Sequence, residues 1–214
     1  MTILSKHWSA TIVAVSLVAN GSAIADESKT TVCVENRDAL LALDAKTFDR
    51  TIGEGWRTVA AKEGCQLAAA DLIAEYRETK LPSEDLRSGS SLIWHEGQAR
   101  AMGGQTEAAI IILAQARRSK IDNSADTAWN LYVDATIAFL KQDRMALDQT
   151  YAELSALPEP DFWAAAVENT KAKYGFTPVW PNNINVVEAF QRCFEKPYSE
   201  AYSRCNEGLG SDQE

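Results

Sequence analysis

One short segment gathers side chains of several chemical types within about two turns of a predicted helix. It contains Trp94, His95, Glu96 and Arg100. A carboxylate or an imidazole can transfer protons when its surroundings tune its pKa, so acid–base chemistry is the first hypothesis. A metalloprotease helix needs a second histidine four residues after the first, and Ala99 stands at that position. The segment therefore does not predict a zinc protease.

The same residues also fit a structural role. Glu96 and Arg100 are four apart in the order that favours an ion pair on a helix surface, worth a few tenths of a kcal/mol. His95 suits a half-buried, hydrogen-bonded ring better than a general base. No nucleophile elbow, phosphate loop or dinucleotide fingerprint accompanies it. We predict no catalytic residue, with one alternative: Glu96 is the general acid of a small helical envelope hydrolase.

A second group of polar residues lies in a later helix. When the segment around Glu96 is moved forward onto this helix, Glu96 falls on Asp134, and Asn130 lies one turn before that aspartate. A lone carboxylate in an apolar helix usually has a partner, because an unpaired buried charge is costly. We expect Arg100 to be the partner of Asp134. The predicted binding residues, which would line the inner groove of a helical array, are Trp94, His95, Glu96, Arg100, Asn130 and Asp134.

Apolar residues recur at helical spacing through most of the chain. The clearest pattern covers 129–140, where large apolar side chains fall at i, i+3 and i+4. The predicted helices are 55–62, 65–76, 91–102, 106–118, 129–140, a segment between Asp143 and Pro158, 161–174 and 183–194. Ser124 or Asp126 can cap the helix at 129–140, and Asp143 can cap the next. Residues 81–89 are predicted to form a polar loop.

These helices form pairs that are related by a shift along the chain. The forward shift that places Glu96 on Asp134 also superposes Trp94 on Tyr132 and Leu113 on Tyr151. Each pair consists of a helix, a tight turn and a second helix rich in alanine. Small residues at crossing points let neighbouring helices approach closely, as an array of hairpins requires.

The pattern resembles a degenerate tetratricopeptide repeat over 54–158. The residues that match in type are Trp94, Gly97, Ala108 or Ala109, Leu113 and Ala116. The period departs from the roughly 34 residues of that family, and the closing proline is absent after Arg118. The resemblance implies an all-α fold of stacked antiparallel helix hairpins with a C-terminal helical cap, and a binding role without catalytic residues. The alternative is an ordinary helical bundle whose hairpins look alike.

The segment 1–25 has a different composition from the rest. Lys6 is its only formally charged side chain, and an apolar run covers 10–19. Small residues then precede Asp26, so we predict a signal peptide at 1–25 that is cleaved between Ala25 and Asp26. The run is too short for the roughly 20 residues of a membrane span. The mature protein would be secreted or periplasmic without a stable membrane anchor, with one domain at 26–207 and a frayed tail at 208–214.

Four cysteines remain after the predicted cleavage site. An even number in an exported chain predicts two disulfides, for which three pairings are possible. Proximity near each end of the chain favours Cys33–Cys65 and Cys193–Cys205. No C-x-x-C spacing occurs and His95 is the only histidine left, so we predict neither a metal site nor a cofactor.

The charge of the chain bears on its partners. The formal net charge is −9, and no cluster of lysine and arginine breaks this balance, which argues against nucleic-acid binding. The five tryptophans after the predicted cleavage site fit a core better than a sugar-binding stripe. We therefore predict an exported binding or scaffold module for a protein or peptide. The alternatives are the Glu96 hydrolase and a purely structural or inhibitory envelope protein.

Overall fold

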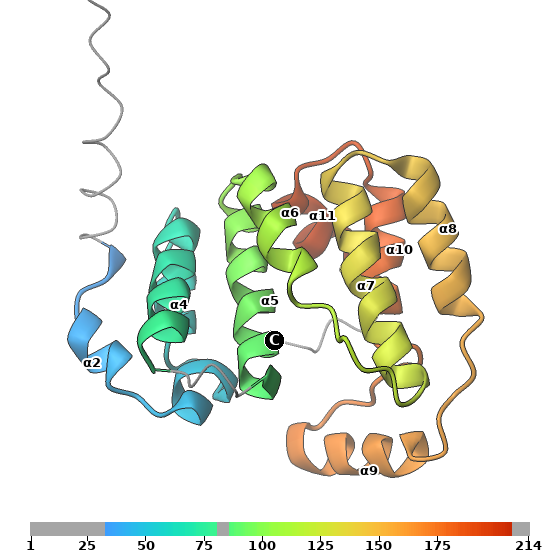
Figure 1. Ribbon diagram of the computed structural model, residues 1–214, viewed down its shortest axis with the longest axis horizontal. Helices are drawn as coiled ribbons and strands as arrows, with labels where there is room; N and C mark the ends of the chain where they lie inside the picture. Colours follow the sequence, from blue (N-terminus) through green and yellow to red (C-terminus); the bar gives the residue numbers. More distant parts are fainter. Residues whose placement is uncertain (1–32, 81–85, 207–214) are drawn as a thin grey trace, which may run out of the picture.

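The described part of the chain consists of helices joined by short connections, as the computed structural model shows (Figure 1). It covers residues 33–80 and 86–206, and no residue in these ranges belongs to a β-strand. The prediction of an all-α fold is confirmed. The predicted signal peptide at 1–25 and the predicted tail at 208–214 lie outside the described residues.

The elements follow each other closely along the chain. In order they are α2 (Arg37–Leu41), the π-helix η1 (Lys46–Arg50), α3 (Arg57–Ala60), α4 (Gln66–Lys80), α5 (Leu86–Met102), α6 (Thr106–Ala114), α7 (Ser124–Leu140), α8 (Arg144–Ser155), α9 (Trp163–Tyr174), α10 (Ile184–Arg192), α11 (Tyr198–Ser203) and the 3-10 helix η2 (Arg204–Asn206). All eight predicted helical segments overlap one of these elements.

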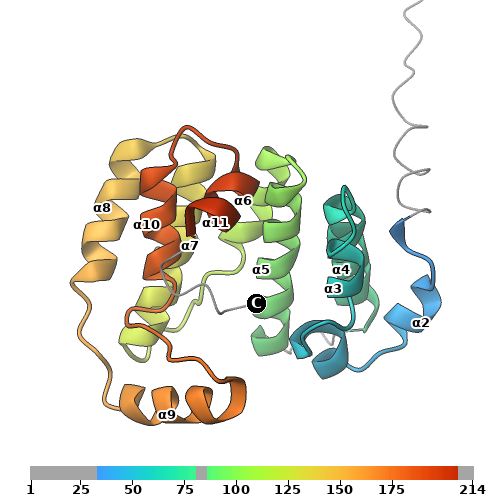
Figure 2. The same ribbon diagram turned by 180° about the vertical axis from the view of Figure 1, so that it is seen from behind.

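Consecutive helices pack against each other. Helix α4 contacts α5, α5 contacts α6, and α7 contacts α8. In Figure 1, α4, α5 and α7 run roughly parallel, with α6 in front between the last two. The view from behind shows α10 and α11 covering the other side, and α9 lying across one end (Figure 2). Helix α5 thus lies in the middle of the molecule, with α4 on one side and α6 and α7 on the other.

The turn between α5 and α6 depends on glycine. Gly104 has a φ of 82°, in the left-handed region where a side chain is strained. Within α5, a Cβ added at Gly97 would lie 2.6 Å from Cγ of Leu113 on α6. The absence of a side chain at Gly97 therefore lets the two helices of this hairpin come close together, which is the role expected of a small residue in the middle of the first helix.

Two clusters of buried apolar residues lie on either side of α5. We call them the N-terminal cluster and the C-terminal cluster. The N-terminal cluster consists of Cys33, Phe48, Trp56, Val59, Cys65, Ala68, Ala69, Leu72, Ile73, Tyr76 and Leu92. The larger C-terminal cluster is built by α5, α6, α7, α8, α10 and α11, and it includes Trp94, Leu113, Tyr132, Phe139, Leu147, Phe190 and Tyr198. Leu92 and Trp94 are two residues apart, so successive faces of α5 serve different clusters.

Several predicted helix ends differ from the structure. Helix α7 begins at Ser124, before the predicted start, and its N-cap is Asn123, whose side chain accepts from the backbone N–H groups of Ala125 and Asp126. The prediction that Ser124 or Asp126 caps this helix is therefore wrong. The cap at Asp143 is confirmed, because its Oδ1 accepts from the backbone N–H of Ala146 at 3.0 Å.

The predicted loop at 81–89 is partly helical, because α5 already begins at Leu86. The pattern missed α2, η1 and α11 altogether. These elements are only 5, 5 and 6 residues long, too short to display a helical period in the sequence. They are stabilised by packing against longer helices rather than by their own helix propensity.

Both predicted disulfides are present. Cys33 and Cys65 are joined by an S–S bond of 2.00 Å, and Cys193 and Cys205 by one of 2.02 Å. The first ties the segment before α2 to the start of α4, and the second ties the end of α10 to η2. Among the described residues, no helix has both the length and the apolar character needed to cross a membrane.

Candidate functional site

Glu96 lies on the side of α5 that faces α4, and it is 2% exposed. Its Oε2 accepts hydrogen bonds from Nε and Nη2 of Arg77 on α4, at 3.0 and 2.5 Å. Its Oε1 accepts from Nε of Arg100, one turn further along α5, at 2.9 Å. Two guanidinium groups thus hold both carboxylate oxygens, and the hydrogen bonds are of the strong, charge-assisted kind.

Arg100 extends this network to a second residue of α4 and to the segment just before α6. Its Nη1 donates to Oε1 of Gln105, just before α6, at 2.9 Å, and its Nη2 lies 3.2 Å from Oδ1 of Asp71 on α4. The predicted pair between Glu96 and Arg100 therefore exists. It differs from the expected surface pair because α4 covers it and adds Arg77, so the network links neighbouring helices instead of facing solvent.

Asp49, on the π-helix η1, is the second buried carboxylate of this region and is 4% exposed. Its Oδ1 accepts from Nε1 of Trp56 at 3.1 Å and lies 2.6 Å from Nδ1 of His95. Its Oδ2 accepts from Oγ of Ser91 at 2.6 Å. Burial alone would raise the pKa of Asp49. The hydrogen bonds and the charge of His95, together with the donors on Ser91 and Trp56, outweigh burial and lower that pKa below its ordinary value.

His95 is half-buried, with a side chain that is 20% exposed and a ring whose centroid lies 5.1 Å from that of Trp56. A histidine fixed by a carboxylate through Nδ1 presents Nε2 in a defined direction, as catalytic and metal-binding histidines do. Ser91, however, donates to Asp49 and not to His95, so these three residues do not form a Ser–His–Asp relay. In the described ranges no three His, Cys, Asp or Glu residues come together as metal ligands would.

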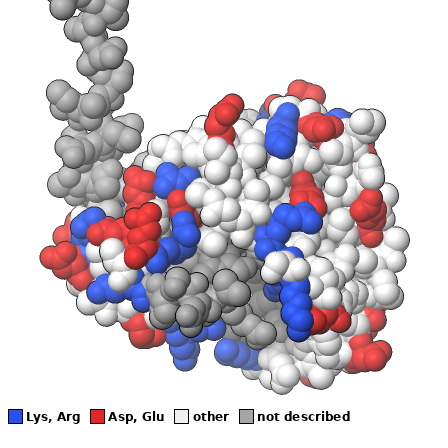
Figure 3. Space-filling view, viewed as in Figure 1, with Lys and Arg blue, Asp and Glu red and all other residues white. Residues whose placement is uncertain are grey.

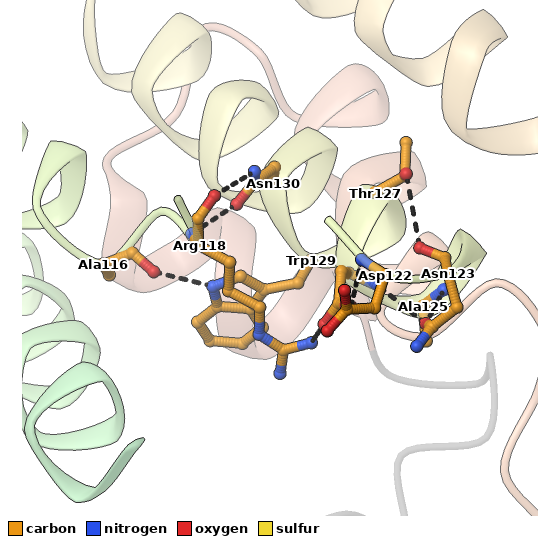
Figure 4. Close-up of polar contacts among 9 residues, drawn as sticks. Ala116, Arg118, Asp122, Asn123, Ala125, Thr127, Trp129 and Asn130 are labelled. Carbon is orange, nitrogen blue, oxygen red and sulfur yellow. Dashed lines mark hydrogen bonds and ion pairs between the residues drawn. The ribbon is translucent and has the colours of Figure 1, made fainter. Parts of the chain in front are cut away.

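Asn130 is part of a different group of contacts, at the connection between α6 and α7 (Figure 4). Its Oδ1 accepts from the backbone N–H of Arg118 at 2.7 Å, and its Nδ2 donates to the carbonyl of the same residue at 2.9 Å. Nε1 of Trp129 donates to the carbonyl of Ala116 at 2.8 Å. Side chains of α7 thus satisfy backbone groups that follow the end of α6 and have no helical partner of their own.

Asp134 forms an ion pair with Arg117, and its side chain is 38% exposed. The prediction that Arg100 is its partner is wrong. The chain after α6 runs back along α7 and brings Arg117 to Asp134, whereas Arg100 lies on the face of α5 that turns toward α4. The predicted ligand-binding residues therefore fall into two groups that make separate contacts.

Trp94, on α5, belongs to neither group and packs against rings of α7. It is 5% exposed, and its ring centroid lies 5.2 Å from that of Trp129 and 4.7 Å from that of Tyr132. Trp94 and Tyr132, which the shift along the sequence superposes, therefore touch each other across α5 and α7. The ring belongs to the C-terminal cluster, as the interpretation of the tryptophans as core residues expects.

Two residues that organise this region were not identified from the sequence. Asp49 lies far before His95 in the chain, with no periodic pattern around it, and Arg77 looks like an ordinary surface residue near the end of a helix. Both acquire their roles from contacts between distant segments, which spacing within one helix does not reveal. The nearest signal in the sequence is that Leu92 and Ala99, four residues before Glu96 and three after it, place this carboxylate on an apolar side of the helix. A buried carboxylate needs a positive partner.

A groove of about 280 Å³ runs along α4, between this helix and the segment that contains Val34 and Arg37. It is lined by Val34, Arg37, Ala68, Asp71, Leu72, Ala74, Glu75 and Glu78. Small-molecule sites usually enclose about 300–1,000 Å³. The volume of this groove lies at the lower end of that range.

The chain was compared with protein families, curated proteins and solved structures. No family model matches it, and neither a curated protein nor a solved structure shows significant similarity.

Proposed function

We propose that this protein is an exported binding or scaffold module, built from tetratricopeptide-like helix hairpins, that engages a protein or peptide. The proposal rests on one observation: the polar residues of α5 contact neighbouring helices instead of solvent. Arg77 on α4 donates to Glu96 on α5. Ser91 and His95 on α5 contact Asp49 on η1. These side chains hold helices together, which leaves the outer surfaces of the array for recognition.

The cysteines support export. Both disulfides persist only where the surroundings are oxidising, as in secreted and periplasmic proteins. The composition of residues 1–25 points the same way, because it has the charge and the apolar run of a signal peptide. Together they favour action outside the cytoplasm.

The charge of the surface supports a neutral or basic partner. The chain carries 30 acidic and 21 basic residues, so its field attracts cationic groups and repels polyanions. Acidic and basic side chains mix over the end of the molecule that α2 and α4 form, while a largely uncharged area covers the upper middle around α6 (Figure 3). A surface of this kind suits proteins better than nucleic acids.

The contacts of Glu96 do not favour the alternative function, a hydrolase with Glu96 as general acid. A general acid must come within hydrogen-bonding distance of the bond that it protonates. Glu96 is 2% exposed, and Arg77 and Arg100 hold both of its oxygens. The replacement Glu96→Gln would abolish turnover of an enzyme, whereas in a binding module it would lower the stability and leave the outer surface in place.

Affinity purification of the tagged, oxidised protein from the envelope fraction of its native cells tests the proposal. We expect a stoichiometric protein partner that is retained at physiological salt and binds again when both components are purified. A control without the tagged protein identifies background. Hydrolysis of an envelope polymer that the Glu96→Gln variant lacks, with no partner retained, would overturn the proposal in favour of the enzyme.

A further inference from the structure

We propose that the groove along α4 binds a cationic amphipathic helix of the partner. This inference rests on the proposed binding function and names the surface and the chemistry of its ligand. Apolar residues of the bound helix would enter the groove, and its lysine or arginine side chains would meet the acidic edge of α4.

The groove exists because the outer face of α4 is incompletely covered. Helix α4 is 15 residues long, whereas α2, which packs beside it, has only 5 residues. Ala68 and Ala74 contribute no side chain beyond Cβ, so the surface between the two helices is hollow. Its floor is apolar, formed by Ala68 and Leu72 with Val34 at the side. In a helical array this is the position where a further full-length helix would pack.

The edge of the groove is acidic. Asp71, Glu75 and Glu78 lie at i, i+4 and i+7, which places them along one stripe of α4. Arg37 is the only basic residue among the lining residues, and it pairs with Glu75. Glu78 is exposed and makes no ion pair with any residue in the described ranges. Asp71 pairs with Arg100, which lies outside the lining. Glu78 is therefore the carboxylate of this edge that is left for a cationic group of a ligand.

The opposite wall of the groove is fixed before a ligand arrives. Val34 follows Cys33, which the disulfide joins to Cys65 just before α4. Nζ of Lys62 donates to the carbonyl of Cys33 at 3.1 Å and to Oε1 of Glu35 at 2.8 Å. A preformed surface spends less free energy on ordering when it binds, so this wall favours recognition of a partner.

The residues that precede Cys33 are poorly matched to the groove. Between Asp26 and Val32 the chain has two acids and one lysine, so even with a free amino terminus this segment has no net positive charge. Charge complementarity therefore favours a basic helix of another protein over the protein's own amino-terminal segment.

The test measures binding of a labelled peptide to the full-length oxidised protein. The probe is a helical peptide of about 14 residues, a length at which isolated helices begin to be stable, with lysines at i, i+4 and i+7 beside a leucine face. The same peptide with glutamate for lysine is the negative control. At physiological salt, where charges are screened beyond about 8 Å, we expect saturable binding of the lysine peptide alone.

Two sets of variants locate the binding. Asp71→Asn, Glu75→Gln and Glu78→Gln together should weaken binding by about tenfold or more, because the groove edge then has no carboxylate and leaves Arg37 and Arg100 to repel the lysines. The control combines Glu153→Gln, Glu159→Gln and Glu168→Gln, which removes the same charge from exposed positions in α8, in α9 and in the connection between them. It should change the affinity by less than about threefold.

A third variant tests the groove without changing its charge. Ala74→Leu should fill the groove and weaken binding, whereas Ala152→Leu, at an exposed position of α8, should not. The groove proposal would be overturned if the two charge variants lost affinity equally, or if Ala74→Leu left the affinity unchanged. It would also be overturned if the lysine peptide did not bind at all. If the purified natural partner still binds the Asp71, Glu75 and Glu78 variant fully, the groove proposal fails while the binding function stands.

Discussion

The N-terminal and C-terminal clusters meet at α5 but are held together by different kinds of contact. Around the N-terminal cluster, buried polar groups link the elements, as in the contacts of Glu96 with Arg77 and of Asp49 with His95. The C-terminal cluster is built mainly from rings and aliphatic side chains. Phe139, for example, stacks on Phe190 at a centroid distance of 4.6 Å.

The difference follows from the side chains that each region supplies. Helix α4 presents Ala68, Ala69 and Ala70 to its neighbours, and alanine buries little apolar area. Charge-assisted hydrogen bonds and a disulfide add stability and fix the register of these helices. Helices α7 and α10 instead present large rings such as Phe139 and Phe190, whose burial stabilises the packing through apolar contacts. The stability of the N-terminal region should therefore depend more strongly on pH and on its disulfide than that of the C-terminal region, which has a shorter disulfide loop.

The largest effect is expected in the C-terminal cluster. Phe139 is 1% exposed and contacts three other rings. Its replacement by alanine removes this packing and leaves a cavity, which should lower the free energy of unfolding by about 3–5 kcal/mol. Urea denaturation at two salt concentrations measures the loss, which should be the same in both. Phe162→Ala, at a ring that is 47% exposed, is the control. A loss below about 1 kcal/mol at Phe139, far less than a buried ring normally contributes, would contradict the account.

Removing the N-terminal disulfide should have the next largest effect. Cys33 and Cys65 are separated by 32 residues, and Cys193 and Cys205 by 12. The chain-entropy relation gives a stabilisation of about 3.7 kcal/mol for the first and about 2.8 kcal/mol for the second. Double cysteine-to-alanine variants of each pair, unfolded thermally, test the order. A larger loss for the C-terminal pair would show that loop length does not govern the difference.

The pH dependence of stability should come partly from Asp49. Because the folded-state pKa of this carboxyl is lowered, its contribution to stability is present above the unfolded value of about 3.9. That contribution is lost as the pH falls through the lower folded-state pKa. Asp49→Asn should cost about 2 kcal/mol near neutral pH and flatten the acid limb of the stability curve. In Phe139→Ala, the free energy of unfolding should decrease with falling pH in the same way as in the unaltered protein. If the free energy of unfolding of Asp49→Asn decreased at low pH as in the unaltered protein, Asp49 would not account for the pH dependence of stability.

The smallest effect is expected at Asp134. Its ion pair with Arg117 joins side chains that are 38% and 44% exposed, so water and salt screen it. Asp134→Asn should change the free energy of unfolding by about 0–1 kcal/mol, and by less at high salt. Chemical denaturation in low and high salt provides the measurement. A loss as large as that of Glu96→Gln would mean that this exposed pair matters as much as the buried network around Glu96.

The sequence was sufficient to predict the long helices and the disulfides. The apolar period of α7 and the loop between Cys193 and Cys205 are local features, so no knowledge of the fold was needed. The partner of Asp134 was predicted wrongly because the shift that relates the helix pairs compares positions within helices. The shift does not predict the path of the chain after α6, which brings Arg117 to Asp134 on α7.

The candidate site was predicted only in part, for a related reason. The i, i+4 relation of Glu96 and Arg100 is visible in the sequence and exists in the structure. Arg77 and Asp49 come from other helices, and their contacts depend on how α4 and η1 pack against α5. Sequence spacing within α5 therefore predicted a surface ion pair, where packing produces a buried network.

A double-mutant cycle between Glu96 and Arg77 tests most directly whether the polar residues of α5 join the helices. The free energy of unfolding is measured for the unaltered protein, Glu96→Gln, Arg77→Met and the double variant. We predict a coupling free energy of about 1.5 kcal/mol or more that persists in high salt, because Glu96 is 2% exposed. A coupling below about 0.5 kcal/mol, the size found for exposed ion pairs, would contradict this account of the site.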